Sequence, residues 1–291
     1  MLLGFPEYGP QATRLAERLG LRHATVDVHR FPDGESRVTL PAALPEHVLV
    51  CRSLDRPNDK LIELLLTAEA ALELGARHLT LVAPYLCYMR QDIAFHPGEA
   101  VSQYIVGRFL ARCFEVVVTV DPHLHRTAQL SDAVPAQRSA ALRAAQAAGA
   151  FLRSRPRDTL LLGPDRESEQ WVAAAAAAAG LPYGVCAKTR SGDREVRIEP
   201  PAIDLAGRPV VLVDDIASSG ATLAVAAQAC RKRGAAQVSA FVTHAVFAHG
   251  AEPRMRDAGI EEIWSSDSVP HATNAVPLAP VLADGLERLG V

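Results

Sequence analysis

The sequence predicts an α/β protein built from two tandem, doubly wound parallel-sheet domains. Its 291 residues are about twice the ~150 residues used as a prior for one domain. Apolar, strand-like runs alternate with helix-like stretches along the whole chain. The chain also echoes itself, because Leu2-Leu3-Gly4 returns as Leu161-Leu162-Gly163 and Gly75-Ala76 returns as Gly234-Ala235. We therefore expect two copies of one fold, related by internal duplication, although any two α/β domains can share echoes of this kind.

Each expected copy alternates strands and helices, with the first domain at 1–140 and the second at 141–291. The strands are continuous apolar runs, which are typical of parallel strands covered on both faces. They lie at 48–53, 78–84, 115–121, 159–163, 210–215 and 237–244, with shorter β-rich segments at 24–28 and 183–187. Helices are expected at 59–76, at the alanine-rich 167–180 and at the terminal 276–290. Ligands of such sheets bind beyond the carboxyl ends of the strands, so the residues that follow each strand are the functional candidates.

Composition narrows the class of protein. Hydrophobic residues make up 49% and charged residues 22%, which excludes a disordered chain, and a net charge of −3 provides no global basic field for nucleic acid. The five cysteines lack CxxC spacing, which favours a reducing compartment over disulfides or zinc. The N-terminus has no signal-peptide pattern, and the longest uncharged run, 171–187, is too short to span a bilayer. We expect a soluble cytoplasmic protein without nucleic-acid or membrane partners.

The strongest functional segment follows the strand at 210–215. That strand ends in Asp214 and Asp215, and a loop of small residues then leads into a helix. The loop residues are Ser218, Ser219, Gly220, Ala221 and Thr222. Small residues let consecutive backbone N–H groups converge on an anion at a helix N-terminus, and the acids suit ribose hydroxyls or Mg²⁺. The alternative is an ordinary Ser/Thr helix cap, which explains one hydroxyl but not two acids and the whole loop.

Polar residues also follow other strands. Arg90 and Gln91 can bond phosphate, ribose or base edges, with an Arg90–Asp92 surface ion pair as the alternative. His123 and Asp165 each follow a strand, one in each copy, and could hold Mg²⁺–triphosphate in a cleft between the domains. A histidine in such a place can instead be structural.

Two glycine-containing hairpins complete the set of candidates. The first, 31–36, carries Phe31, Asp33 and Glu35. The second, 187–198, carries Lys188 and Arg190 beside a turn at Gly192, and two neighbouring cations on a flap suit charge stabilisation in phosphoryl-type transfer. Plain exposed hairpins are the alternative for both.

The ordered motifs resemble those of the ribose-phosphate pyrophosphokinases, also called phosphoribosyl-pyrophosphate (PRPP) synthases, whose domains have the type I phosphoribosyltransferase fold. The matching segments are FPDGES (31–36), DRPND (55–59), PYLCYMRQD (84–92), DPHLH (121–125), GPDRES (163–168) and the loop segment 210–222. The resemblance implies transfer of the pyrophosphoryl group of ATP to the anomeric hydroxyl of D-ribose 5-phosphate. The products would be AMP and PRPP, which feeds nucleotide, histidine and tryptophan biosynthesis.

The resemblance also implies a role for each candidate. Lys188 and Arg190 would be catalytic, and Asp214, Asp215 and loop 218–222 would bind ribose 5-phosphate. ATP would be bound by Phe31, Asp33, Glu35, Arg90, Gln91 and His123, and Mg²⁺ would be held at His123 and Asp165. The region 51–66 of the first copy lacks the glycine and hydroxyl run of the loop, so that copy has lost phosphate binding.

The family's hairpin at 31–36 reaches a neighbouring subunit, which implies a homo-oligomer with a dimer as minimal unit and a tetramer or hexamer as larger alternatives. Many members have an acid where this chain has Ser218 and glycine where it has Ala221, and the forms at 90–100 and 188–193 are nearer the archaeal-type members. Regulation by phosphate or ADP is therefore not implied. Two other functions stay open: a catalytically silent regulatory subunit, and a phosphoribosyltransferase that consumes PRPP.

Overall fold

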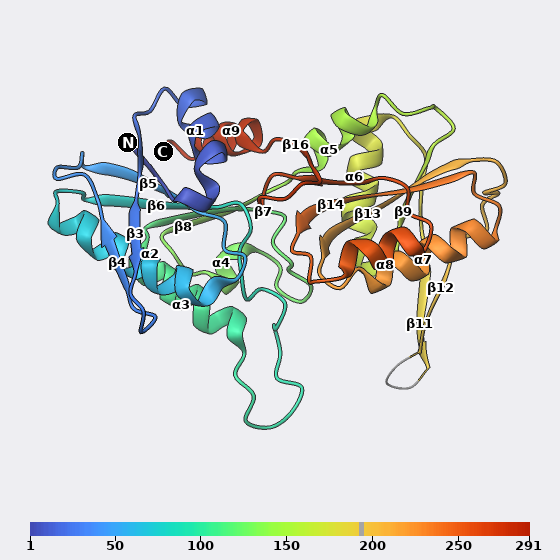
Figure 1. Cartoon of the computed structure of the whole chain (residues 1–291), viewed down its shortest axis with the longest axis horizontal. Coiled ribbons are helices and arrows are strands. Elements are labelled where there is room, and N and C mark those ends of the chain that lie inside the picture. Colours follow the sequence, from blue (N-terminus) through green and yellow to red (C-terminus); the bar gives the residue numbers. More distant parts are fainter. Residues whose placement is uncertain (192–194) are drawn as a thin grey trace. The chain divides into compact units, whose positions relative to one another are not determined.

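A computed structural model describes the chain at residues 1–191 and 195–291, so the expected turn at Gly192 lies outside the described residues. Contacts divide the chain into two units, each built on a six-stranded parallel sheet (Figure 1). Unit 1 comprises Met1–Arg143, Ser268–Pro270 and Leu278–Val291, and unit 2 comprises Ala144–Asp267 and His271–Pro277.

The sheet of unit 1 has the strand order β2-β1-β5-β6-β7-β8. Its strands are β1 (Leu2–Gly4), β2 (His23–Thr25), β5 (His47–Cys51), β6 (His78–Ala83), β7 (Val116–Val120) and β8 (Arg138–Leu142). A separate antiparallel hairpin consists of β3 (Asp27–Arg30) and β4 (Ser36–Thr39). The helices are η1 (Pro6–Tyr8), α1 (Gly9–Arg18), α2 (Pro57–Glu73), α3 (Ser102–Cys113), α4 (Leu130–Ala133) and α9 (Ala279–Arg288).

The sheet of unit 2 has the order β10-β9-β13-β14-β15-β16, which is the order of unit 1 with each strand replaced by its counterpart. Its strands are β9 (Leu160–Gly163), β10 (Tyr183–Val185), β13 (Pro209–Ala217), β14 (Gln237–Ala245), β15 (Ile263–Ser266) and β16 (Asn274–Val276). The matching hairpin is β11 (Ala187–Ser191) and β12 (Glu195–Glu199). The helices are α5 (Ala145–Leu152), η2 (Arg166–Ser168), α6 (Glu169–Ala179), α7 (Ala221–Lys232) and α8 (Ala251–Asp257). The predicted duplicated, doubly wound fold is confirmed.

The β-rich segments at 24–28 and 183–187 each divide between a sheet and a hairpin, where the sequence predicted one short strand. In unit 1, Val26 is buried and its N–H donates to the carbonyl of Gly4 at 2.8 Å, after which the chain leaves the sheet as β3. Cys186 repeats this arrangement, donating to the carbonyl of Gly163 at 2.9 Å before β11. A buried apolar residue thus anchors the base of each hairpin.

The helix that follows the last strand of each sheet packs in the other unit. Helix α5 follows β8 of unit 1 but packs on α6 of unit 2, and α9 follows β16 of unit 2 but packs on α1 of unit 1 (Figure 1). The alanine run of α6 and Gly149 of α5 allow a close approach, because small side chains bring helix axes together. The two copies therefore exchange covering helices.

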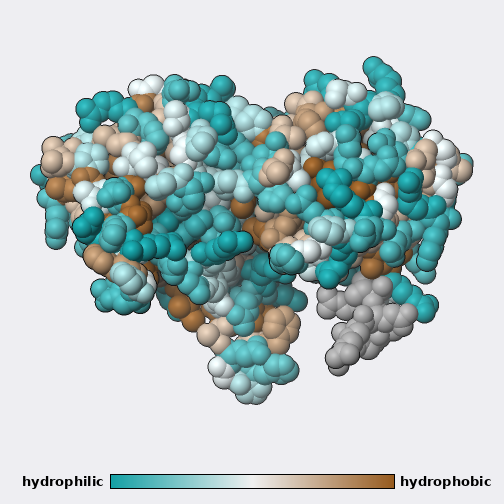
Figure 2. Space-filling model, viewed as in Figure 1, coloured by the Kyte–Doolittle hydropathy of each residue, from teal (hydrophilic) through white to brown (hydrophobic). Residues whose placement is uncertain are grey.

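The described part of the chain has no helix long and apolar enough to cross a membrane. Figure 2 shows a face on which hydrophobic residues form small patches among hydrophilic ones. Large hydrophobic side chains that are exposed include Ile62 and Ile105 of unit 1 and Tyr183 of unit 2.

We predict that Gly149→Ala weakens the α5–α6 contact. A Cβ at this position would lie 2.4 Å from Ala178 Cβ and 2.8 Å from the Ala175 carbonyl oxygen, so the helices must separate. The free energy of unfolding should fall by about 1–3 kcal/mol, as in other overpacked sites. Urea unfolding followed by circular dichroism measures this change.

The matched control is Gly9→Ala, because a Cβ at Gly9 meets nothing within 4 Å. It should change the free energy of unfolding by less than about 1 kcal/mol. Equal stability of the two variants would contradict the close approach of the exchanged helix.

Candidate active site

Asp214 and Asp215 lie in strand β13, as expected, and the strand continues for two residues beyond its predicted end, to Ala217. Asp215 is buried, and its N–H donates to the Asp214 carboxylate at 3.0 Å. Burial, the Asp215 carboxylate and the Asp165 carboxylate, in that order, raise the pKa of Asp214 well above its ordinary value. The Asp215 and Asp165 carboxylates thus both oppose ionisation of Asp214, and a cation bound beside Asp214 would favour its ionised form.

The loop at 218–220 joins β13 to α7, and the last two predicted loop residues, Ala221 and Thr222, form the first turn of that helix. Gly220, rather than a serine or threonine, is the helix N-cap, with a left-handed backbone (φ +70°). The Ser219 hydroxyl nevertheless accepts a hydrogen bond from the Ala221 N–H at 3.4 Å, so one serine does contribute to capping α7. The loop is held by its carbonyl groups: Ala248 N–H donates to Ser218 O at 2.9 Å, and Arg254 Nη1 donates to Ser219 O at 2.8 Å. The backbone at the start of α7 can therefore receive an anion.

Lys188 and Asp165 form an ion pair that the sequence did not predict. Asp165 follows β9 and caps η2, accepting a bond from Ser168 N–H at 3.3 Å. Lys188 lies on β11, and its Nζ donates to Asp165 Oδ2 at 2.7 Å. The proposed flap cation and one proposed metal ligand are thus direct partners. Arg190 lies on the same strand, but its side chain is outside the described part of the structure.

A cavity of about 620 Å³ opens beside this pair. It is lined by Asp165, Arg166, Glu167, Cys186, Ala187 and Lys188. Burial, followed by the influence of Cys230 and Asp165, raises the pKa of the Cys186 thiol to about 12. This thiol stays protonated at neutral pH and is no nucleophile, so the cavity offers charges rather than a covalent centre.

In unit 1, polar candidates follow β6 and β7. The His123 ring meets the His125 ring edge-on, with the two ring centroids 3.9 Å apart. Gln91 accepts a short hydrogen bond from the Ser102 hydroxyl at the start of α3. Asp92 is buried and pairs with Arg126 at 2.9 Å rather than with Arg90, whose side chain is exposed. The Arg90–Asp92 alternative is therefore wrong, and Arg90 stays available to a ligand.

Phe31, Asp33 and Glu35 are exposed in the turn between β3 and β4. The turn is closed by Phe31 N–H donating to Glu35 O at 2.8 Å, and Glu35 N–H donates to Asp33 Oδ1 at 3.1 Å. The Phe31 ring meets His29 edge-on at 4.7 Å. The hairpin thus presents one aromatic ring and two carboxylates to its surroundings.

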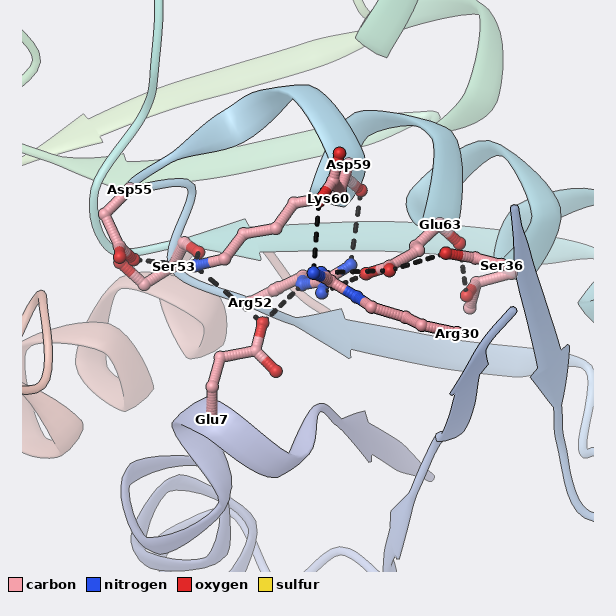
Figure 3. Close-up of polar contacts among 10 residues, drawn as sticks. Glu7, Arg30, Ser36, Arg52, Ser53, Asp55, Asp59, Lys60 and Glu63 are labelled. Carbon is pink, nitrogen blue, oxygen red and sulfur yellow. Dashed lines mark hydrogen bonds and ion pairs between the residues drawn. The ribbon is translucent and has the colours of Figure 1, made fainter. Parts of the chain in front are cut away.

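The two copies differ most at the end of the strand that carries Asp214. Strand pairing places Val50 beside Leu3 and Leu212 beside Leu162, and Leu3 and Leu162 are counterparts in the repeat. Two residues further along, unit 1 therefore has Arg52 where unit 2 has Asp214. Arg52 is buried in an ion cluster that sequence reasoning missed, although a charge at the end of an apolar run was a visible signal (Figure 3). An internal cation in unit 1 thus stands where unit 2 has Asp214.

Comparisons with known proteins agree with this architecture. Residues 2–113 match the family model described as the N-terminal domain of ribose phosphate pyrophosphokinase, and residues 136–281 match the phosphoribosyl transferase domain. The chain is 37% identical to a ribose-phosphate pyrophosphokinase of Methanopyrus kandleri, covering 95% of this chain and 94% of the relative. It is 32% identical to one from Thermococcus kodakarensis, covering 90% and 92%. A crystal structure of phosphoribosylpyrophosphate synthetase from Mycobacterium smegmatis superposes with a TM-score of 0.84 at 23% identity, covering 100% and 98% of the two chains.

Two sheets of the same strand order, each of phosphoribosyltransferase type, define a tandem enzyme of that fold. The chain belongs to the ribose-phosphate pyrophosphokinase family, and the two archaeal relatives named above align with it along nearly their whole length. It is accordingly a transferase of the ribose-phosphate diphosphokinase type, as the sequence predicted.

Proposed function

We propose that this chain transfers the pyrophosphoryl group of ATP to D-ribose 5-phosphate, with residues 1–140 on the ATP side and 141–291 on the ribose 5-phosphate side. The anomeric hydroxyl attacks the β-phosphorus of ATP, the bond from that phosphorus to the α-phosphate oxygen breaks, and AMP leaves as PRPP forms. The observation that supports these roles best is the Lys188–Asp165 pair beside the acids of β13. A silent regulatory subunit would not need to retain this pair.

The ribose 5-phosphate site is proposed at the carboxyl end of β13. The phosphate would bind the backbone N–H groups and hydroxyls of residues 218–222, where the dipole of α7 favours an anion. Asp214 and Asp215 would accept bonds from the 2- and 3-hydroxyls of the ribose. Ser218 would donate or accept a hydrogen bond but cannot act as a base. Asp214 and Asp215 would therefore be the carboxylates of the proposed ribose 5-phosphate site.

Lys188 and Arg190 would stabilise the charge that develops on the transferred phosphoryl oxygens and on the leaving AMP. Lys188 already lies against Asp165, which holds its ammonium group in place until the substrates arrive. Fixed cations of this kind lower the barrier because they need little reorganisation in the transition state. No covalent intermediate on the protein is required.

The ATP site is proposed on unit 1, at Phe31, Asp33, Glu35, Arg90, Gln91 and His123. The Phe31 ring suits contact with adenine, and the exposed Arg90 guanidinium suits a phosphate. Hairpin 31–36 would complete the ATP site of a neighbouring subunit, which requires a homo-oligomer with a dimer as minimal unit. The five free cysteines support a reducing, cytoplasmic location.

Mg²⁺ fits the donors of the proposed site. In unit 2, Asp165, Asp214 and Asp215 offer carboxylate oxygens, the ligands that Mg²⁺ prefers. In unit 1, His123 offers an imidazole, which would bind the ion directly or through water. The described residues contain no group of three or more His, Cys, Asp or Glu side chains that could hold a metal ion by themselves. These donors suit an ion whose remaining ligands are substrate phosphates and water. Such an ion would neutralise part of the phosphate charge.

We predict that Lys188→Ala lowers kcat for AMP formation by about 10²–10³-fold, the usual effect of removing one preorganised donor. The fold should persist because Lys188 lies on a partly exposed hairpin. Arg197→Ala is the matched control, since Arg197 pairs with Thr189 and so projects from the opposite face of the hairpin. Steady-state assays with ATP, Mg²⁺ and ribose 5-phosphate measure the effect, and near-normal turnover of Lys188→Ala would remove this cation from the mechanism.

The loop assignment predicts a selective loss in Gly220→Ala. A Cβ would meet Met255 Cγ at 2.9 Å on a left-handed backbone, so the loop must shift. The KM for ribose 5-phosphate should rise by about tenfold or more, since a left-handed alanine costs about 1–2 kcal/mol. Gly207→Ala is the control, because Gly207 has a similar φ of +72° in open space before β13 begins. Equal KM values for the two variants would contradict the phosphate loop.

Removal of divalent metal should abolish AMP formation without unfolding the protein. The assay is run in excess EDTA and again after Mg²⁺ is added back, with circular dichroism recorded in parallel. Activity should return with Mg²⁺ while the spectrum stays constant, because no protein cage depends on the ion in the described residues. Full turnover in EDTA would exclude the proposed metal role.

A further inference from the structure

The buried carboxylate of Glu63 gathers donors from three segments of unit 1 (Figure 3). Its Oε1 accepts hydrogen bonds from the Ser36 hydroxyl at 2.9 Å and from Arg30 Nη2 at 3.3 Å. Its Oε2 accepts a short bond from Arg52 Nη2. Glu63 lies on α2, Arg52 follows β5, and Arg30 and Ser36 belong to the β3–β4 hairpin. One side chain therefore ties the hairpin to the helix and to the sheet.

The two donors on the hairpin lie at the base of its turn. Arg30 and Ser36 are the last paired residues of the hairpin, immediately before and after the turn at 31–35. Glu63 thus holds both arms at the base of the turn that carries Phe31, Asp33 and Glu35. Arg30 also pairs with Asp59 of α2 at 3.1 Å, but that pair is largely exposed and therefore weak.

Arg52 is fixed on all sides, and it fixes Glu63 in turn. Its Nε donates to Glu7 at 2.8 Å, its Nη1 donates to the Lys60 carbonyl at 3.2 Å, and its guanidinium lies 3.7 Å from the centroid of the Phe5 ring. Burial would raise the pKa of Glu63, but hydrogen bonds and charge from Arg52, with Ser36 and Arg30 adding to them, outweigh it and lower that pKa. Glu63 therefore remains an ionised acceptor.

The charges around Arg52 leave it little capacity for an outside anion. Lys60, the other buried cation here, donates to the Ser53 carbonyl at 2.8 Å and to Asp55 at 2.7 Å. Three carboxylates, those of Glu7, Asp55 and Glu63, surround these two cations and more than neutralise their charge. This cluster stands at the strand end where unit 2 has its proposed sugar-phosphate site, so the same place in the fold serves another purpose here.

We propose that Arg52 and Glu63 are positioning residues that hold the turn at 31–35 in the orientation in which it binds ATP. This inference rests on the proposed assignment of the turn to ATP binding. A cavity of about 530 Å³ separates the turn from the start of α2 and is lined by Gly34, Glu35, Ser36, Asn58, Asp59 and Ile62. Because the turn lacks packing on that side, the bonds to Glu63 below it determine where its side chains lie.

The test compares substrate KM values in variants of the hairpin contacts. Ser36→Ala and Arg30→Ala each remove one bond to Glu63 from partly exposed positions, so both variants should fold. We expect the KM for ATP to rise on the order of tenfold, as for loss of a hydrogen bond to a charged group, while the KM for ribose 5-phosphate stays within about twofold. Ser36→Thr retains the hydroxyl and should restore the KM for ATP.

Arg37→Ala is the matched control, because Arg37 is an exposed cation on the same hairpin and makes none of these bonds to Glu63. Its KM for ATP should equal that of the parent protein. Glu63→Gln combined with Arg30→Ala should raise the KM for ATP by less than the product of the single effects, because both remove the same contact. If Glu63→Gln fails to fold, Ser36→Ala and Arg30→Ala still decide the matter.

Phe31→Ala separates this inference from the assignment on which it rests. If Phe31→Ala raises the KM for ATP but Ser36→Ala and Arg30→Ala do not, the positioning role is overturned while the turn remains the ATP contact. If Phe31→Ala has no effect on that KM, the ATP assignment of the turn itself fails. If Ser36→Ala raises the KM for ATP and the KM for ribose 5-phosphate by similar factors, the inference is also overturned, because the substitution then disturbs the protein as a whole.

Discussion

The continuous apolar strands of this protein must be covered on both faces, and the rest of the structure depends on that constraint. Strands such as β7 and β14 are buried along nearly their whole length, and many functional candidates lie near the carboxyl ends of strands and in the loops beyond them. Each unit also contains a helix that follows a strand of the other unit. Helix α5 follows β8 of unit 1 but packs in unit 2, and α9 follows β16 of unit 2 but packs in unit 1. Burial of the sheets thus joins the two copies and directs functional side chains to one edge of each sheet.

The same strand end has diverged into two electrostatic arrangements. In unit 2, the Asp215 and Asp165 carboxylates oppose the ionisation of Asp214, and this electrostatic setting favours a bound cation. In unit 1, Arg52 and Glu63 form a buried pair, and breaking such a pair commonly costs about 3–5 kcal/mol because one charge is left without a partner. The same position in the two sheets therefore carries neighbouring acids in unit 2 and a buried ion pair in unit 1.

Charge balance also explains how the second hairpin can carry a reactive cation. Lys188 is partly buried, and its ion pair with Asp165 offsets the cost of desolvating the ammonium group. The first hairpin is fixed instead by Glu63, which lies beneath the base of its turn and leaves the turn residues exposed.

The sequence by itself determined the duplicated α/β fold, the strand ends and the family, because apolar runs, glycine-containing turns and ordered motifs are local features of the chain. It also indicated most candidate residues, from Phe31 to Thr222. Only the tertiary structure decided that Lys188 meets Asp165, that Asp92 meets Arg126 rather than Arg90, and that Arg52 meets Glu63. It alone revealed the exchange of α5 and α9. Partners far apart in sequence are selected by packing and by the need to neutralise buried charge, and neither leaves a periodic signal in the chain.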